Sequence, residues 1–301
     1  MKKTTLAFLP LLLLGAAGAQ AQLGAYLPEP GQWIVSASYQ YQRYDSFWLG
    51  GTSIDLDVAT GFHEQRQHSA YLTFEYAFCP RFALDATVGY SWTEFHDGPP
   101  GVADLTDDGL TDTSIGARFL LVDERVTKCS PTVTLRVGGI IPGTYNDAFP
   151  FSVGDGAAGV EVAALFARQI CTGFGLYGEF GYRWRDHDVP EELFGAAGAT
   201  MTYRGVSLSA GYRQSESTHG PDIGDPGFGT KFGFPQTREI DKRIEASLGY
   251  SDPGGRYYAL YYARTFDGRN TGQKDVFGVT ISIPFGGKAE PLPPPGRYGK
   301  K

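Results

Sequence analysis

The most informative feature of the chain is an alternation of apolar and polar residues with a period of two. Between Phe174 and Arg185, every second residue up to Trp184 is apolar or glycine, whereas the alternate positions include Glu179 and Arg183. Successive side chains of a strand point to opposite faces, so one face is apolar and the other charged. This segment is long for a soluble strand but suits a tilted strand that crosses a bilayer with about 9–11 residues.

The same alternation recurs along the chain and predicts about twelve strands. The expected strands span residues 32–44, 67–78, 82–95, 110–122, 131–141, 157–170, 174–185, 192–203, 205–214, 239–251, 256–266 and 274–285. In hydrocarbon every backbone N–H and C=O group needs a partner within the protein. The first and last strands are therefore expected to pair and close the sheet, with apolar faces outward and polar faces toward a lumen.

The connections between these strands alternate in length. Short turns near residues 80, 126, 172, 204 and 253 alternate with loops at 45–64, 96–109, 142–156, 186–191, 215–238 and 267–273. An outer-membrane barrel has an even number of strands, short periplasmic turns and longer outer loops, whereas a Greek-key sandwich has no reason for this regularity. The sequence therefore predicts an all-β fold, a transmembrane up-and-down antiparallel β-barrel with periplasmic termini.

The ends of the chain differ from this central pattern. Lys2 and Lys3, an apolar core and a small-x-small site at Ala19-Gln20-Ala21 are typical of a secretory signal. We expect a signal peptide at 1–21, a mature start at Gln22, a barrel over 22–286 and a disordered Pro-rich periplasmic tail over 287–301. Loss of the two lysines leaves 24 basic and 33 acidic residues, a net charge of about −9, which disfavours nucleic-acid binding.

Three cysteines, Cys79, Cys129 and Cys171, map to three successive periplasmic turns of an exported chain. Three is an odd number, so at most one bridge can form within the chain. Neighbouring turns are about 12 Å apart around the rim, whereas a disulfide needs Cα atoms within about 7 Å. The longer turn that carries Cys129 could bring it to Cys79 or to Cys171; the alternative is three free thiols.

Several short motifs carry a family resemblance, clearest over residues 70–185. They are Glu75-Tyr76, Asp112 with Gly116-Ala117-Arg118-Phe119, Pro131, Ile141-Pro142-Gly143-Thr144, and the glycines Gly154 and Gly156. With these motifs the chain resembles the outer-membrane "meta-pathway of phenol degradation" family of proposed transporters. The resemblance implies a barrel associated with uptake of small, often aromatic or hydrophobic compounds. The chain departs from the family by continuing past Phe285, which bears on its recognition by the barrel-assembly machinery.

Ten charged residues are expected to face the lumen. They are Glu75, Asp85, Arg118, Arg136, Glu161, Glu179, Arg183, Arg213, Arg243 and Glu245. They could line a pore and set its selectivity. Alternatively they could form an interlocking set of salt bridges, because a barrel of about twelve strands is narrow beside porins of 16–18 strands. The mixed signs favour pairing, which is compatible with a pore-lining role.

The sequence contains only weak signals for metal binding or catalysis. The acidic run of Asp104, Asp107, Asp108 and Asp112 could hold calcium, but a solvated loop is the simpler interpretation. The five histidines have no ligand spacing, no Gly-x-Ser-x-Gly occurs, and Ser215, Ser217 and His219 are too close along one loop to form a triad. We therefore expect no metal site, no cofactor, no catalytic residues and no enzymatic activity.

Taken together, these patterns predict a porin-like outer-membrane channel of a Gram-negative envelope for passive uptake of small solutes, including aromatic or hydrophobic ones. The alternative is a plugged barrel with a structural or surface-interaction role through the loops at 45–64 and 215–238; an outer-membrane hydrolase is the least favoured. The expected partners are membrane lipid and lipopolysaccharide, the assembly machinery and a small-molecule solute, with no nucleic acid.

Overall fold

The computed structural model describes residues 24–127, 129–149 and 152–287. The predicted signal peptide, the predicted mature start at Gln22 and all but the first residue of the predicted tail lie outside the described residues. In the described part of the chain, no helix is long and apolar enough to cross a membrane.

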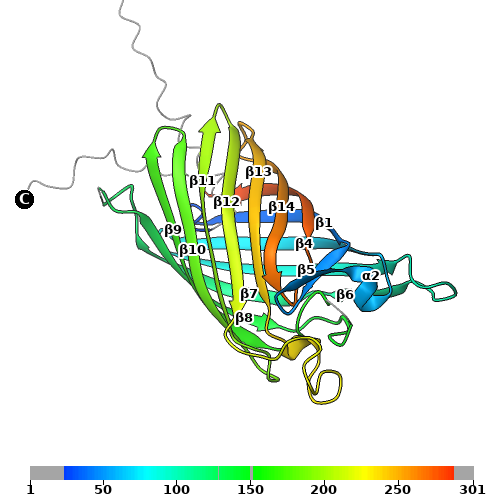
Figure 1. Ribbon diagram of the computed structural model, residues 1–301. Helices are drawn as coiled ribbons and strands as arrows, with labels where there is room; N and C mark the ends of the chain where they lie inside the picture. The colour runs from blue at the N-terminus through cyan, green and yellow to red at the C-terminus, as the bar shows by residue number, and fades with distance from the viewer. Residues whose placement is uncertain (1–23, 128, 150–151, 288–301) are drawn as a thin grey trace, which may run out of the picture.

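A closed antiparallel barrel of twelve strands makes up most of the described chain (Figure 1). Its strands are β1 (Gln32–Tyr44), β4 (Glu64–Cys79), β5 (Phe82–His96), β7 (Thr113–Val122), β8 (Thr132–Ile141), β9 (Gly159–Cys171), β10 (Phe174–Arg185), β11 (Glu192–Tyr203), β12 (Val206–Ser217), β13 (Ile240–Ser251), β14 (Tyr257–Arg269) and β15 (Asp275–Gly286). Each strand pairs with its neighbours in the chain. The first and last strands pair from Gln32 opposite Gly286 to Arg43 opposite Asp275, so the predicted closure is confirmed.

The two ends of the barrel differ in the length of their connections. One end, here the turn end, has short turns such as those between β4 and β5 and between β9 and β10, together with the start of β1 and the end of β15. The opposite end, here the loop end, has the long connections. The alternation of short and long connections predicted from the sequence is therefore present.

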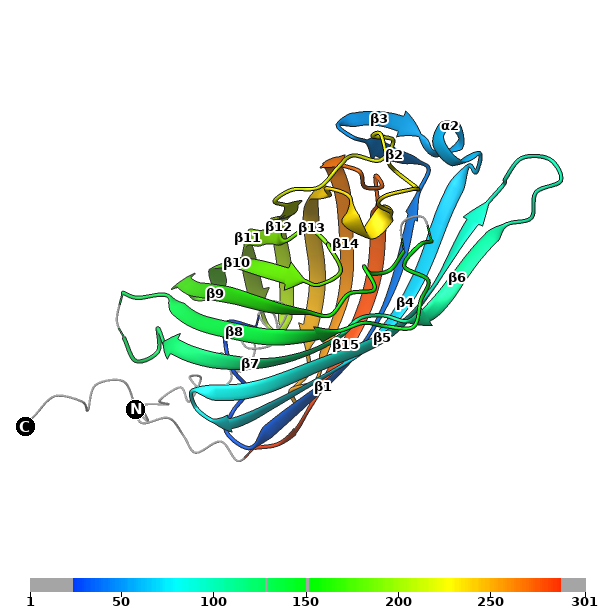
Figure 2. The same ribbon diagram turned by 90° about the horizontal axis from the view of Figure 1, so that it is seen from below.

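The loop end also contains elements that the alternation does not predict. They are β2 (Ser46–Leu49), β3 (Thr52–Asp55), α2 (Leu56–Thr60), β6 (Leu105–Leu110) and the 3₁₀ turn η1 (Phe234–Gln236). Strand β6 pairs with the loop-end half of β5, whereas β7 pairs only with its turn-end half. Together β5 and β6 project past β7, β8 and β9 (Figure 2).

The outer wall of the barrel is apolar. Every second strand residue points outward, and large apolar side chains remain exposed there, as in Phe180 (61%), Leu260 (58%) and Leu208 (55%). So continuous an exposed apolar surface is unfavourable in water. Around a closed barrel it forms the lipid-facing band of a membrane-spanning protein.

The inner wall is lined by small and polar side chains. Hydroxyl pairs link adjacent strands, with Ser36 and Ser282 oxygens 2.7 Å apart and Ser209 and Ser247 oxygens 2.6 Å apart. These pairs satisfy polar groups away from bulk water, where an unpaired hydroxyl is costly. Charged side chains occupy other positions on the same face and form the candidate site.

Candidate functional site: the barrel lumen

All ten charged residues predicted to face the lumen lie on the inner wall, and each belongs to an ion pair. The clearest sign of inward orientation is the pairing of Arg118 with Glu75. Arg118 is on β7 and Glu75 is on β4, and β5 lies between these strands. The two side chains can meet only across the concave face of the sheet.

Most of these residues form one continuous chain of ion pairs along the wall from β4 to β11. Arg118 contacts Glu75 and lies 3.4 Å from Asp85. Arg136 joins Asp85 to Glu161 at 2.8 and 2.6 Å, and Arg183 joins Glu161 to Glu192 at 2.6 and 3.1 Å. Arginine and carboxylate therefore alternate across the inner surface.

A second, shorter chain lies on the wall formed by β10, β12 and β13. Arg213 contacts Glu179 at 2.9 Å and Glu245 at 2.8 Å, and Arg243 lies 3.5 Å from Glu245. The Tyr261 hydroxyl also donates to Glu245, at 3.1 Å. Glu245 thus has two cationic partners, Arg213 and Arg243, and one hydroxyl donor, Tyr261.

The pairing has an energetic reason. The side chain of Arg118 is only 5% exposed, and those of Glu75 and Asp85 are 14% and 10% exposed. A desolvated charge is expensive unless it is paired and hydrogen-bonded. The stability of each buried charge therefore depends on its partners, and removal of one side chain would leave the others buried without a counter-charge.

Sequence reasoning missed a third cluster, near the loop end of the lumen. Arg185 contacts Asp112 at 2.5 Å and Asp155 at 3.3 Å, and the Tyr145 hydroxyl donates to Asp112. Burial raises the pKa of the Asp155 carboxyl. Arg185 could have been found because it shares the inward face of its strand with Arg183, whereas Tyr145 and Asp155 lie in an irregular loop with no pattern.

A partly open cavity of about 270 Å³ lies between the first chain of ion pairs and the cluster around Arg185. Its lining includes the guanidinium groups of Arg136, Arg183 and Arg185 and the carboxylates of Asp112 and Glu161. Arg183 also lies over the Phe194 ring, 5.1 Å from its centroid. The cavity can therefore offer paired charges to a small solute.

The turn end of the lumen is occupied by the segment Gly24–Tyr26, which precedes β1. Arg118 donates to the Gly24 carbonyl at 3.2 Å, Thr134 donates to the Ala25 carbonyl at 2.6 Å, and the Tyr26 hydroxyl donates to Glu124. Gly24 has φ +62°, and a Cβ there would lie 2.8 Å from Arg118 Nη1. Only glycine fits this approach without strain, so the segment is held closely against the wall.

Apolar contacts add to these hydrogen bonds. Ala25 is 2% exposed and belongs to a buried cluster with Ala163, Leu165, Ala167 and Phe194 on the inner wall. We call Gly24–Tyr26 the turn-end segment. Sequence patterns do not predict this segment, because three residues carry no periodicity and their partners are far away in the chain.

The loop end contains a different structure, which we call the aromatic cluster. It consists of Tyr44, Phe47, Leu56, Phe62, Phe95 and Phe149. The Phe95 ring lies 5.7 Å from that of Phe62 and 5.6 Å from that of Phe149, centroid to centroid. Phe95 is on β5, whereas Phe62 and Phe149 come from two separate loops, so the cluster joins loops across the mouth of the barrel.

The remaining predicted sites are the three cysteines and the acidic run, of which Asp112 alone belongs to the lumen. Cys79, Cys129 and Cys171 are free and exposed, so the structure contains neither of the alternative bridges, and the pairing stays a prediction. The four aspartates of the acidic run take separate partners: Asp104 contacts His96, Asp107 accepts from the Asn146 backbone, Asp108 accepts from Tyr90, and Asp112 contacts Arg185. Among the described residues, no His, Cys, Asp or Glu cluster could hold a metal ion.

Comparisons with known proteins identify the fold. No protein-family model matches the chain and no curated protein matches it, so membership of the phenol-degradation family remains a prediction. The COG4313 outer membrane channel from Pseudomonas putida F1 matches with a TM-score of 0.68 and 13% sequence identity, over 87% of this chain and 98% of that one.

Other barrels match less well. The CymD monoaromatic hydrocarbon channel has a TM-score of 0.45 and 10% identity, over 90% of this chain and 94% of that chain. A Pseudomonas aeruginosa FadL homologue has a TM-score of 0.42 and 12% identity, over 90% and 97% of the two chains. The likeness to the COG4313 channel supports the barrel architecture. At 13% identity it does not extend to the chemistry of the lumen, which follows from this chain's own residues.

Proposed function

We propose that this protein is an outer-membrane channel for the passive passage of small solutes. The observation that carries the proposal is the arrangement of the lumen. A charged cavity lies between two closures, and these closures are built largely from loops and from a segment outside the barrel strands. Such segments can move without breaking the barrel, whereas side chains packed between strands cannot.

The orientation follows from the same division of the molecule. The loop end faces the outside of the cell and the turn end faces the periplasm, because long loops are tolerated outside and short turns form inside. A solute would enter past the aromatic cluster, cross the charged cavity and leave past the turn-end segment. The aromatic rings at the entrance favour small solutes with an aromatic or hydrophobic part.

Planar-bilayer recordings test this proposal. The purified protein should give stepwise current, and Phe149→Ala, which weakens the loop-end closure, should raise the frequency of open events. Arg183→Ala should change the ion selectivity, because it removes a cation from the cavity and leaves Glu161 and Glu192 without that partner. Outward-facing Phe180→Ala is the matched control for the first substitution.

A second candidate function is a closed barrel with a structural or surface-interaction role. It is favoured by the pairing of all ten predicted lumen charges and by the closure of both ends. Absence of stepwise current from the wild type and from Phe149→Ala would support this alternative and contradict the channel.

A further inference from the structure

The outer wall carries two ordered rows of side chains across five strands near the loop end. Strand register places Tyr262, Phe277, Tyr41, His68 and Trp92 side by side, and the next outward positions toward the loop end are Arg264, Asp275, Arg43, Arg66 and Glu94. We call these sets the aromatic row and the charged row. Amphipathic aromatic rings collect at the level of lipid headgroups, so the charged row lies where the headgroups begin.

The aromatic row is well packed. The rings of His68 and Trp92 stack with centroids 4.8 Å apart and an interplanar angle of 6°. Tyr41 lies 5.0 Å from His68, and Tyr262 lies 5.1 Å from Phe277. These contacts give the charged row a rigid base.

The charged row contains an unfavourable pair. Arg43 on β1 and Arg66 on β4 are directly opposite each other and both point outward. Like charges at opposite positions of an antiparallel pair are destabilising. An anion bound between them would turn this repulsion into attraction.

Arg43 is the side chain available for such an anion. Arg66 pairs with Glu64 at 2.7 Å, and Arg264 lies 3.9 Å from Asp275. Within the described ranges, no carboxylate or other acceptor pairs with the Arg43 guanidinium, which is exposed. Asp275 lies directly opposite Arg43 on β15 but is paired with Arg264, and Glu64 is paired with Arg66, so Arg43 keeps its donors free for a further acceptor.

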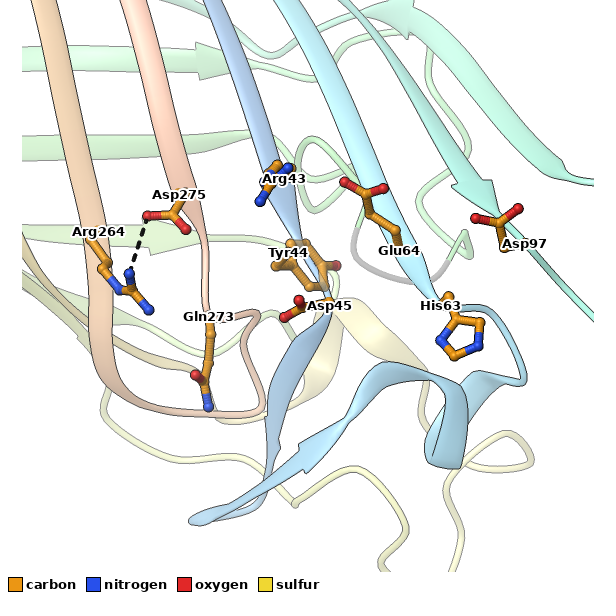
Figure 3. A pocket seen from close by; sticks show the side chains of 9 residues that line it. All are labelled: Arg43, Tyr44, Asp45, His63, Glu64, Asp97, Arg264, Gln273 and Asp275. Atoms are coloured by element: carbon orange, nitrogen blue, oxygen red, sulfur yellow. Dashed lines mark ion pairs between the residues drawn. The ribbon is translucent and has the colours of Figure 1, made fainter.

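A cavity of about 510 Å³ opens beside Arg43, between the loop-end parts of β14, β15, β1 and β4. Figure 3 shows Arg43 between Asp275 and Glu64, with the Arg264–Asp275 ion pair beside it. This volume lies in the range of small-ligand sites, about 300–1,000 Å³. Asp45 and Asp97 also line the cavity, but they follow the last residues of β1 and β5 and so lie nearer the loop end than Arg43.

We propose that this cavity binds the phosphorylated headgroup of an outer-leaflet glycolipid, with its phosphate on Arg43 and beside Arg66. A guanidinium binds phosphate through two parallel N–H···O bonds. The aromatic row below would contact the sugar and the first part of the acyl chains. The site rests on the proposed orientation in the outer membrane but does not depend on the lumen being open.

Binding of lipid A to the purified full-length barrel in detergent tests this site by native mass spectrometry. The probes are lipid A with two phosphates, the same lipid with its phosphates removed, and inorganic phosphate. We expect retention of the phosphorylated lipid and at least about a tenfold loss of affinity in Arg43→Gln, because the variant loses the charge-assisted hydrogen bonds to the phosphate. Arg43→Lys should recover part of the loss. Arg125→Gln, an exposed arginine at the turn end, is the matched control.

Thermal unfolding separates this site from a general effect on folding. Without lipid, Arg43→Gln should unfold at about the same temperature as the wild type, because the substitution removes both the repulsion from Arg66 and the attraction to Asp275, which lie opposite Arg43 on its two sides. With lipid A, the wild type should be stabilised by ligand binding and the variant should not. Three results would each overturn the proposal: equal retention of lipid A by Arg43→Gln, equal binding of the dephosphorylated lipid, or loss of binding when divalent cations are chelated. Competition by millimolar inorganic phosphate would assign the site to free phosphate instead. Absence of channel current with intact lipid A binding would refute only the proposed function.

Discussion

The two ends of the lumen are held by different combinations of interactions. At the turn end, a segment lies against the wall and receives hydrogen bonds from Arg118 and Thr134. At the loop end, rings from separate loops pack on one another around Phe95. The first closure combines hydrogen bonds from the barrel wall with the burial of Ala25, whereas the second depends on apolar contacts between loops and the ends of β1 and β5.

This difference predicts different responses to substitution. Hydrogen bonds are directional and involve few atoms, so single side chains of the wall should control the turn end. Apolar burial is non-directional and shared, so the loop-end cluster should weaken in proportion to the ring area removed. Arg118 is exceptional because it belongs both to the turn-end closure and to the ion-pair chain of the wall.

The largest effect is expected from Arg118→Ala. The substitution leaves Glu75 and Asp85 buried without this cation and removes the donor to Gly24. Loss of one partner from a buried ion pair costs about 3–5 kcal/mol. Denaturant unfolding in detergent measures the loss, and bilayer recordings should show more frequent opening.

Arg125→Ala is the control for this substitution. Arg125 is 45% exposed and pairs with Asp123 in a turn, so its loss should cost less than about 1 kcal/mol. Equal destabilisation by the two variants would show that the inner ion pairs are no stronger than surface pairs.

The next effect is expected from Phe149→Ala at the loop end. Phe149 is 8% exposed and packs on Phe95, so truncation should cost about 3 kcal/mol or less, because a loop can partly collapse into the space left. Open events should increase while the barrel itself stays folded. A separate loop-end closure would be contradicted if Phe149→Ala unfolded the barrel strands as well. It would also be contradicted if the current of Phe149→Ala equalled that of the wild type and of Phe180→Ala.

How far the sequence predicts this arrangement depends on the kind of residue. Arg183 could be placed on the inner wall because alternation along a strand fixes which face a side chain occupies. The register and closure of the barrel follow from the same alternation, since a slip of one residue would turn every apolar side chain inward. The twelve strands were therefore predictable.

The closures were not predictable for a physical reason. Ala25 contacts Thr134 across more than a hundred residues, and no local pattern encodes such a contact. Phe149 lies in a loop of mixed composition, where an apolar residue gives no direction. The strand β6 was also missed, because Asp107, Asp108 and Gly109 disfavour strands, and its pairing with β5 overrides that preference.

A smaller effect is expected from Thr134→Val at the turn end. The substitution keeps the shape of the side chain but removes the hydroxyl that donates to the Ala25 carbonyl at 2.6 Å. A net contribution of about 1 kcal/mol should shift the closed–open equilibrium of the turn end by roughly fivefold. The matched control is Thr280→Val, which removes a hydroxyl bonded to Ser38 instead. An identical change of current in both variants would mean that the hydroxyl of Thr134 has no particular role in closure.

The smallest effect tests whether the loop-end closure is apolar. His187 lies in the exposed β10–β11 loop, and its hydrogen bond to Asp186, together with the charge of that carboxylate, raises the pKa of the imidazole above its usual value. A raised histidine pKa stabilises the loop at low pH, and this contribution is lost as the pH rises through the raised value. Asp186→Asn should therefore lower the midpoint of the His187 titration, measured by NMR. Between about pH 6 and pH 8, the bilayer current of Asp186→Asn should equal that of the wild type. The loop-end closure depends on burial of the phenylalanine rings, and this burial does not change when the His187 imidazole loses its proton.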